Sequence, residues 1–273
     1  MQGAVLMKNL FAGLKDEEIF YYQDNLLLIN GNCIDWLNRL EKNSVDMIFA
    51  DPPYFLSSGG ITCHSGKMVS VDKGEWDKPS TLNEIHSFNK EWLYACKRVL
   101  KDGGTIWISG TLHNIYSIGF ALNELEYKIL NNITWYKKNA SPNLSCRYFT
   151  HSTETILWAR KGKKTSHYFN YNLMKEMNGG KQMRDVWEIP TTKKSEKAHG
   201  RHPTQKPIEL LERIILASTK INDIVLDPFN GSGTTGVVAK KLNRRYIGID
   251  IEKEYLELTI KRLEATENEL ELY

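Results

Sequence analysis

The chain has 273 residues, with 36 Lys and Arg against 33 Asp and Glu and a formal net charge of +3. No apolar run approaches the roughly 20 residues of a membrane-spanning helix, and the apolar stretch from Ala4 to Met7 is too short for a signal peptide. The scattered cysteines lack the spacing of a zinc site; they stand at positions 33, 63, 96 and 146. These features exclude a membrane protein and predict a cytoplasmic protein with reduced thiols, built as one large or two small domains.

Seven runs have the length and apolar character of strands, and helical patterns lie between most of them. Strands that alternate with helices predict an α/β fold with a doubly wound, seven-stranded, mostly parallel sheet. Two stretches break the alternation, at 56–81 and 161–206, and long irregular segments of this kind are usually functional or mobile. The expected strands are Leu26–Asn30, Val45–Ala50, Thr105–Ser109, Asn132–Tyr136, Thr155–Ala159, Ile224–Asp227 and Arg245–Asp250.

The second expected strand ends at the motif Asp51-Pro52-Pro53-Tyr54. Neither proline can donate to a β-ladder and each locks φ, so the strand must end in a rigid turn. The turn offers a carboxylate and backbone carbonyls as acceptors for an amino group, beside an aromatic ring on which a flat base can lie. The motif therefore predicts a binding site for a base that carries an exocyclic amine.

A basic segment follows in the second half of the chain. From Arg160 to Lys206 there are 12 Lys and Arg against 4 Asp and Glu, whereas the rest of the chain has 24 against 29. A basic segment in a mildly acidic protein favours a polyanion such as DNA as partner. A solvated loop is the alternative reading of the same charges. The candidate phosphate contacts are Lys193, Lys194, Lys197 and Arg201.

A glycine-rich turn follows the strand that ends at Asp227. Gly231, Gly233 and Gly236 fit the pattern G-x-G-x-x-G, and a helix is expected from about Thr234. Asp250 stands 19 residues after the first of these glycines, at the end of the next strand, where an acid binds ribose hydroxyls in nucleotide folds.

Only one helix follows Asp250, so the other strands must come from earlier in the chain and their order is permuted. The best neighbour for strand 224–227 is the strand that ends at Asp51, which would place Asp51 and Asp227 at adjacent strand ends around the ligand crevice. The Asp227 carboxylate would repel a pyrophosphate and favour an ammonium group. A ligand with a ribose and an amino-acid ammonium but no phosphate is S-adenosylmethionine.

Together these motifs resemble the amino-methyltransferases of DNA in their permuted β-class arrangement. In that class the D-P-P-Y element comes first, a target-recognition region follows, and the cofactor loop comes last. The spacing of 176 residues from Asp51 to Asp227 fits this order, and the run from His202 to Pro207, H-P-T-Q-K-P, looks like the entry to the helix on the cofactor side. The resemblance implies a class I methyltransferase fold, with a catalytic and cofactor-binding domain at 1–160 and 202–273 and a target-recognition insertion at 161–201.

The stretch from Asn143 to Glu154 is more narrowly similar to the second adenine methyltransferase of DpnII-type restriction systems. This resemblance implies transfer of a methyl group to adenine N6 in double- or single-stranded DNA at GATC, without a metal. Homodimers are frequent among β-class relatives, so a homodimer is one option. Arg147 and His151 either contact DNA or are structural.

The resemblance also implies residue roles. The amine of adenine would donate to the Asp51 carboxylate and the Pro52 carbonyl, and the base would stack on Tyr54. After the first strand the family commonly has Gly-Asp where this chain has Gly31-Asn32, which puts the cofactor contact of Asn32 in doubt. The expected catalytic residues are Asp51, Pro52, Pro53 and Tyr54, and the expected cofactor-binding residues are Asn32, Lys206, Asp227, Phe229, Gly231, Gly233, Thr234 and Asp250.

Other functions stay open at this point. An N4-cytosine methyltransferase uses the same machinery, but more often has Ser in the position of Asp51. A non-catalytic DNA-binding relative would tend to lose Asp51, Tyr54 and the glycine loop, all of which this chain retains. A nicotinamide-dependent dehydrogenase is disfavoured by Asp227 and by the permuted order.

Overall fold

The apolar runs of the sequence form one sheet in the computed structural model of the protein, which describes residues 7–55, 61–64, 67–70, 81–162, 164–200 and 202–271. The side chains of 61–70 and 267–271 are outside this description. Within the described residues the sheet has nine strands in the order β1-β2-β11-β10-β3-β6-β8-β7-β9, and a separate hairpin is formed by β4 and β5. The strands are β1 Ile19–Gln23, β2 Leu26–Asn30, β3 Val45–Ala50, β4 Ile61–His64, β5 Lys67–Ser70, β6 Leu100–Gly110, β7 Lys128–Tyr136, β8 Thr153–Arg160, β9 Val186–Glu188, β10 Ile224–Asp227 and β11 Arg245–Asp250.

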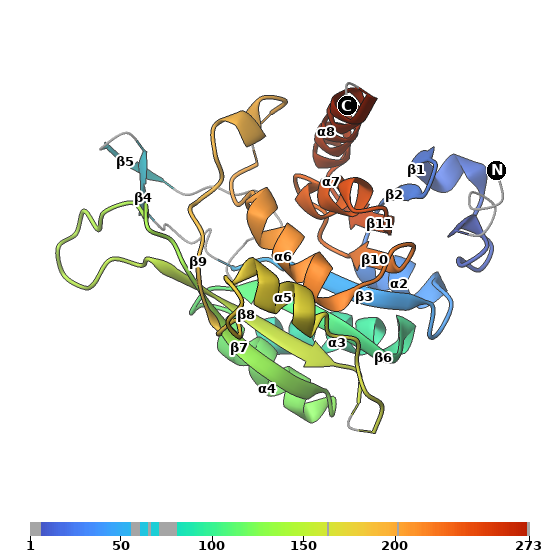
Figure 1. The fold of residues 1–273 in the computed structure, drawn as a ribbon, viewed down its shortest axis with the longest axis horizontal. Helices are drawn as coiled ribbons and strands as arrows, with labels where there is room; N and C mark the ends of the chain where they lie inside the picture. The colour runs from blue at the N-terminus through green and yellow to red at the C-terminus, as the bar shows by residue number, and fades with distance from the viewer. Residues whose placement is uncertain are drawn as a thin grey trace.

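Helices cover both faces of this sheet (Figure 1). In β3, Ile48 and Ala50 belong to the core under α2, α3 and α4, whereas Met47 and Phe49 belong to the core under α6 and α7. A central strand that is apolar on both faces is expected where both faces are covered. The helices are α2 Cys33–Arg39, α3 Leu82–Val99, α4 Ile115–Glu124, α5 Tyr171–Met177, α6 Ile208–Ser218, α7 Thr234–Lys241 and α8 Lys253–Glu271, with short 3₁₀ turns η1 Asp16–Glu18 and η3 Ser195–Lys197.

The permuted strand order is confirmed. Strand β10 runs parallel to β3, with Val225 opposite Met47 and Leu226 opposite Ile48. On its other side β10 is parallel to β11, which is in turn parallel to β2. The carboxyl ends of β2, β11, β10 and β3 therefore lie side by side, although β10 and β11 follow β2 and β3 by about two hundred residues of chain.

The predicted count of seven strands is wrong, since the described sheet has nine. All seven expected strands are present, and the two additional ones lie at the edges. Strand β1 pairs antiparallel with β2 and is only half-buried throughout, although its residues I-F-Y-Y-Q favour a strand, so it was missed despite its apolar character. Strand β9 is three residues long, too short for any alternation to show. Edge strands are typically short or polar, which is why sequence patterns miss them.

The basic stretch 161–201 is partly built into the main sheet. Its strand β9 pairs parallel with β7, and the buried Trp187 packs on Trp107 with ring centroids 6.1 Å apart. The Glu196 carboxylate accepts from the backbone N–H of Ile208 at 2.9 Å and so anchors η3 to the start of α6. Among the helices of the described residues, none has the length and apolar character needed to cross a bilayer.

Candidate active site

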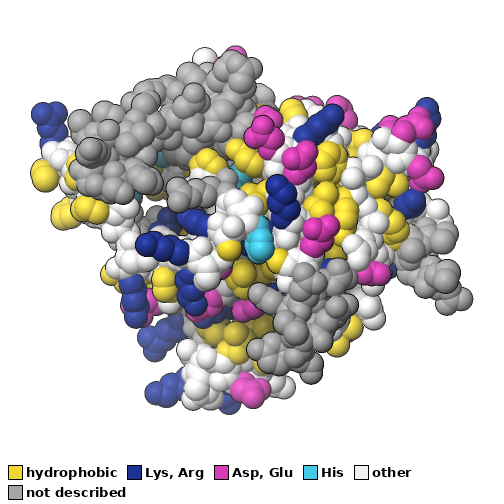
Figure 2. All heavy atoms as spheres, turned by 90° about the horizontal axis from the view of Figure 1, so that it is seen from above, with side chains coloured by type: hydrophobic (Ala, Val, Ile, Leu, Met, Phe, Trp, Pro, Cys, Tyr) yellow, Lys and Arg dark blue, Asp and Glu magenta, His cyan; other side chains and the backbone are white. Residues whose placement is uncertain are grey.

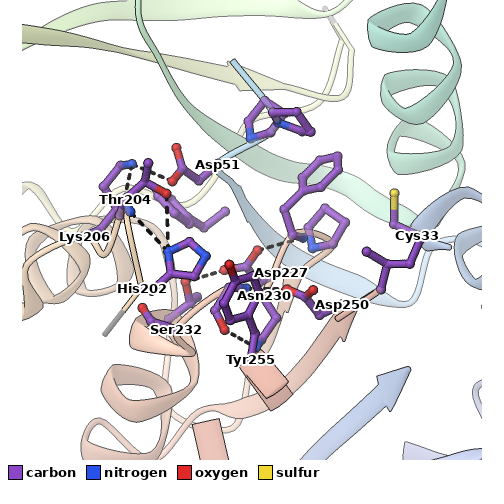
Figure 3. Close-up of a pocket in the computed structure, with 18 of the residues that line it drawn as sticks. Cys33, Asp51, His202, Thr204, Lys206, Asp227, Asn230, Ser232, Asp250 and Tyr255 are labelled. Atoms are coloured by element: carbon purple, nitrogen blue, oxygen red, sulfur yellow. Dashed lines mark hydrogen bonds and ion pairs between the residues drawn. The ribbon is translucent and has the colours of Figure 1, made fainter. Parts of the chain in front are cut away.

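A pocket of about 290 Å³ opens at the adjoining carboxyl ends of β2, β11, β10 and β3. This volume is at the lower end of the range for small-molecule sites. Figure 3 shows Asp51 and Lys206 facing each other on one side of the pocket, with Asp227 and Asp250 on the other. The pocket is lined by all but one of the residues that were predicted for catalysis and cofactor binding. They are Asn32, Asp51, Pro52, Pro53, Tyr54, Lys206, Asp227, Phe229, Gly231, Thr234 and Asp250.

The Asp51-Pro52-Pro53-Tyr54 turn is fixed from behind by buried amides. Asn114 donates to the Pro53 carbonyl at 2.8 Å. Asn89 in turn donates to the Asn114 side chain at 2.6 Å and accepts from the Trp92 indole at 3.1 Å. Free carbonyls were expected in this turn, but the Pro53 carbonyl accepts from this chain of amides. Pro52 lines the pocket, and among the described residues its carbonyl has no hydrogen-bond donor.

The Asp51 carboxylate is bound by two donors. Its Oδ1 accepts from the Tyr54 hydroxyl at 2.5 Å and its Oδ2 from the Lys206 ammonium at 2.5 Å. Lys206 also lies 3.1 Å from the Tyr54 hydroxyl, and its side chain is only 5% exposed. Such short contacts between charged groups are strong hydrogen bonds. The ammonium of Lys206 therefore lies on the Asp51 side of the pocket.

Glu154, in β8, completes this arrangement of charges. Its Oε2 lies 3.7 Å from the Lys206 ammonium and accepts from Ser109 at 3.3 Å, and its Oε1 is paired with Lys137. Two carboxylates and two ammonium groups thus form one largely buried network of alternating charge, in which Lys206 is the most buried. Neither Glu154 nor Lys137 was predicted to be a site residue from the sequence. They lie 17 residues apart, on either side of the loop that joins β7 to β8, and only the pairing of these two strands brings them together.

Burial and pairing act in opposite directions on these groups. Burial raises the pKa of Asp51, and the nearby Lys206 offsets only part of that rise. Burial alone would lower the pKa of Lys206, but the Asp51 and Glu154 carboxylates outweigh it and the pKa is raised. Burial would likewise raise the pKa of Glu154, but Lys206 and Lys137 keep it below its ordinary value. Lys206 is therefore charged at neutral pH and Glu154 is ionised.

Asp227, at the end of β10, is 2% exposed and its carboxylate is held by neutral donors. Oδ1 accepts from the backbone N–H of Phe229 at 3.1 Å and Oδ2 from the Thr235 hydroxyl at 2.6 Å. Burial raises the pKa of this carboxyl to about 7. A buried acid with neutral donors and no cation is poised to gain one from a ligand.

Asp250, at the end of β11, is arranged in the same way. Its Oδ2 accepts from the backbone N–H of Gly231 at 2.6 Å and its Oδ1 from that of Glu252 at 2.9 Å. Burial raises the pKa of Asp250 to about 6. The bond to Gly231 ties the glycine loop to the end of the neighbouring strand and leaves further acceptor sites on the carboxylate for ribose hydroxyls.

The remaining predicted cofactor residues differ in their surroundings. Phe229 packs edge-on against Trp92, with centroids 5.3 Å apart, while it also lines the pocket. Asn32 caps α2 by accepting from Ile34 at 2.8 Å. Thr234 donates to the Lys206 carbonyl at 3.1 Å and so joins the start of α7 to the H-P-T-Q-K-P segment.

Gly233 is the one predicted cofactor residue that does not line the pocket. Its φ is +71°, and a Cβ at this position would lie 2.3 Å from the side chain of Thr259. The glycine is therefore required by the packing of α7 on α8, whichever ligand the pocket holds. His202 and Tyr255 were not assigned a role, and they line the pocket with their rings 4.3 Å apart.

The predicted DNA-contacting residues that the structure describes, Lys193, Lys194 and Lys197, do not line this pocket. Lys193 and Lys194 are exposed and Lys197 is half-buried, all at or next to η3. Arg201 lies outside the described residues. Their contact with DNA stays a prediction.

Comparison with known proteins gives the pocket its context. The family model N6_N4_Mtase, described as DNA methylase, matches residues 45–261. The chain belongs to the DNA methylase family. It is 62% identical to the type II methyltransferase M2.DpnII of Streptococcus pneumoniae over 260 residues, which cover 95% of this chain and 97% of that protein. It is also 56% identical to the type II methyltransferase M2.MboI of Moraxella bovis over 238 residues, 87% of either chain.

Solved structures agree on the fold. The complex of M1.HpyAVI with S-adenosylmethionine superposes with a TM-score of 0.65 at 28% identity, covering 87% of this chain and 98% of that one. The cytosine-N4-specific PvuII DNA methyltransferase superposes with a TM-score of 0.70 at 18% identity, covering 87% and 86%. The chain therefore has the class I S-adenosylmethionine-dependent fold, and it is a DNA methyltransferase that uses this cofactor.

The pocket of this methyltransferase fits S-adenosylmethionine. The Asp227 carboxylate, which lacks a cation among the described residues, suits the ammonium of the methionine part. Asp250 suits the ribose, and Phe229 and Pro228 give an apolar wall. The cofactor supplies an electrophilic methyl group on a sulfonium, and the acceptors of the Asp51 turn lie on the opposite side of the same pocket.

Proposed function

We propose that this methyltransferase methylates the exocyclic N6 of adenine in DNA, at GATC, after the base has been flipped out of the duplex, and that it acts within a restriction-modification system. The observation that carries the proposal is the acceptor pair at the end of β3. The Asp51 carboxylate and the Pro52 carbonyl belong to a turn that Asn114 holds rigid, and both line the cofactor pocket. An amino group has two N–H donors, and this turn offers two acceptors.

The chemistry needs little more than these acceptors. The lone pair of an aromatic amine is delocalised into its ring, and two acceptors on its N–H groups favour a pyramidal nitrogen with the lone pair exposed. As the nitrogen forms its bond to the methyl carbon, the carbon–sulfur bond breaks and the electron pair stays on sulfur, which leaves S-adenosylhomocysteine. The proton that N6 then loses goes to Asp51 or through it to water. Positioning and charge stabilisation supply most of the rate.

In this proposal the base displaces the hydrogen bond between Tyr54 and Asp51. The Tyr54 hydroxyl donates to Asp51, and the amine of adenine takes its place while the ring of Tyr54 stacks on the base. Lys206 stays on the other carboxylate oxygen, and its charge offsets part of the rise in the pKa of Asp51 that burial and the nearby Glu154 cause. Asp51 thus accepts from the amine until the methyl group is transferred, and it then takes up the proton that N6 loses.

The choice of GATC is supported by the similarity of the stretch 143–154 to the second methyltransferase of DpnII-type systems and by the high identity to M2.DpnII and M2.MboI. Phosphate contacts are proposed for Lys193, Lys194, Lys197 and Arg201 in the insertion 161–201. Such contacts give affinity more than sequence choice. A homodimer stays a prediction, which the mass of the protein in solution would test.

One experiment tests the substrate. The enzyme is incubated with labelled S-adenosylmethionine and with duplex or single-stranded oligonucleotides that contain GATC, or the same bases in an order that lacks it. The DNA is then digested to nucleosides and the labelled one is identified. We expect N6-methyladenine only from GATC-containing DNA. N4-methylcytosine would refute the adenine assignment, and equal labelling of both sequences would refute GATC.

A further inference from the structure

The loop between β7 and β8 projects far from the sheet, at the left of Figure 1. At its tip Phe149 is 96% exposed and the neighbouring Tyr148 is 60% exposed. Hydrophobic and basic side chains protrude together at the same left edge in Figure 2. Large apolar side chains that protrude singly are ordinary on protein surfaces, but two adjacent aromatic rings at the end of a projecting loop indicate a contact surface.

The tip is held in one conformation by its own hydrogen bonds. The Asn143 side chain donates to the Tyr148 carbonyl at 2.6 Å and accepts from the backbone N–H and hydroxyl of Ser145, at 3.0 and 2.8 Å. The ring of Tyr148 lies 5.3 Å from that of His151. A loop that is ordered before it binds loses little conformational entropy on binding, so these bonds preorganise Phe149 in its exposed position.

The charge of the loop identifies the kind of partner. Residues 137–152 contain Lys137, Lys138 and Arg147 and no Asp or Glu. Lys137 is paired with Glu154 and Lys138 with Glu188 at 2.9 Å, so Arg147 is the cation that stands next to the aromatic tip. An exposed aromatic tip beside an arginine suits a polyanion with flat, stackable groups, and nucleic acid has both. An apolar protein surface would not require the absence of acids from sixteen consecutive residues.

The root of the loop is part of the active site. The backbone N–H of Lys137 donates to the Ser152 carbonyl at 2.8 Å and closes the hairpin. The side chain of Lys137 pairs with Glu154. Glu154 in turn lies 3.7 Å from the ammonium of Lys206, which is bonded to Asp51. The base of the loop is thus linked to the Asp51 carboxylate through Glu154 and Lys206, and the loop extends outward from there.

We propose that this loop enters the DNA and that Phe149 stacks in the space that the target base leaves when it is flipped out. The inference rests on the proposed function in one respect, which is that the target base leaves a duplex. Apolar side chains inserted between base steps are a general means of unstacking DNA. Tyr148 lies beside the inserted ring, and Arg147 contacts the flanking phosphates.

The proposal distinguishes paired from unpaired targets. A paired base must be unstacked at a cost that falls when the base is mismatched or already single-stranded. Phe149→Ala should therefore lower kcat/KM about 10-fold on a duplex, since stacking on one aromatic ring is worth a factor of that order. On a single strand of the same sequence the rate should stay within about twofold of wild type. A duplex with a mismatch at the target should recover most of the loss.

Two further variants make the test specific. Ile221→Ala removes a side chain that is also exposed, at 65%, just before β10 and so at the opposite end of the strands, and it should change neither substrate. Phe149→Leu keeps apolar bulk without a ring, and its kcat/KM on a duplex should fall between those of wild type and Phe149→Ala.

A binding experiment reports base flipping directly. With 2-aminopurine in place of the target base, fluorescence should rise on binding of wild type and much less on binding of Phe149→Ala.

If Phe149→Ala lowered kcat/KM equally on duplex and single-stranded DNA, the proposal would be overturned. It would also be overturned if kcat/KM fell on neither substrate. A wild-type enzyme active only on single strands would overturn it too. These outcomes are separable from a failure of the proposed function. If the labelled product were N4-methylcytosine, the adenine assignment would fail while the contrast between duplex and single strand at that cytosine still decided the role of Phe149.

Discussion

The two sides of the pocket hold their carboxylates in different ways. On the cofactor side, Asp227 and Asp250 are bonded to backbone N–H groups and to a hydroxyl, and no cation pairs with either within the described part of the chain. On the catalytic side, Asp51 is bonded to the buried ammonium of Lys206. Burial raises the pKa of all three carboxyls, to about 7 for Asp227 and about 6 for Asp250.

This difference indicates which side receives a charge from its ligand. Burial makes Asp227 costly to ionise, and an ammonium brought by the cofactor would remove that cost. Asp51 already has its cation, so a neutral amine can bind to it without bringing charge. The catalytic side is complete before the substrate arrives, whereas the cofactor side becomes electrostatically balanced only when the cofactor is bound.

Replacement of Asp51 should have the largest effect. In Asp51→Ala the amine loses a charged acceptor, and methyl transfer should fall at least about 100-fold, the loss typical of removing one preorganised electrostatic contact. The dissociation constant for S-adenosylmethionine should stay within about threefold of wild type, because Asp227 and Asp250 are untouched. Single-turnover methylation and calorimetry measure the two quantities.

Either of two results would contradict the separation of the pocket into a catalytic side and a cofactor side. Retained methyl transfer would remove Asp51 from the reaction. A large loss of cofactor affinity would mean that the two sides are coupled, with Lys206 as the shared group, since its carbonyl also accepts from Thr234 at the start of α7.

Replacement of Asp227 should affect cofactor binding and stability in opposite directions. In Asp227→Asn the ammonium loses a buried charged partner, and affinity for S-adenosylmethionine should fall about 30-fold or more. The bonds from Phe229 and Thr235 can both be kept, because an amide can accept one and donate the other. Calorimetry at pH 7 tests the first effect.

The stability effect depends on pH with a definite sign. Because the folded pKa of Asp227 is raised from 3.8 to about 7, the folded protein binds more protons than the unfolded chain between these values. This carboxyl therefore lowers stability progressively as pH rises from about 4 to 7, by up to about 4 kcal/mol. Thermal unfolding without cofactor should show Asp227→Asn more stable than wild type at pH 8 and similar to it at pH 4. A wild type that is the more stable at pH 8 would contradict the raised pKa.

Much of the pocket was predictable from the sequence, because the strand ends that form it are marked by short local motifs. The double proline after β3 and the glycine turn after β10 each mark a strand end, and the single helix after Asp250 implies the permuted order that the pairing of β10 with β3 confirms. The strand count was wrong because edge strands such as β9 are short and lack a pattern.

The buried network around Asp51 was not predictable in the same way. Asn114 precedes α4 and Glu154 lies in β8, and neither has a motif around it that indicates contact with the turn after β3. They reach it through tertiary packing, since β6 separates β3 from β8 in the sheet. Lys206 could be placed near the pocket from its segment, but its position against Asp51 depends on where α6 begins, after Pro207.

The smallest predicted effect lies outside the pocket, on the basic segment next to η3. Lys193→Ala with Lys194→Ala removes two exposed charges, so the slope of log affinity for DNA against log salt should become less steep by about 2, with a loss of several-fold in affinity near physiological salt. Lys42→Ala with Lys220→Ala is the matched control, because both residues are exposed and precede β3 and β10, at the strand ends away from the pocket. Binding titrations over a range of salt give both slopes. Equal slopes for the two double variants would mean that Lys193 and Lys194 face only solvent, and DNA would then be held by other groups, of which the β7–β8 loop is the first to test.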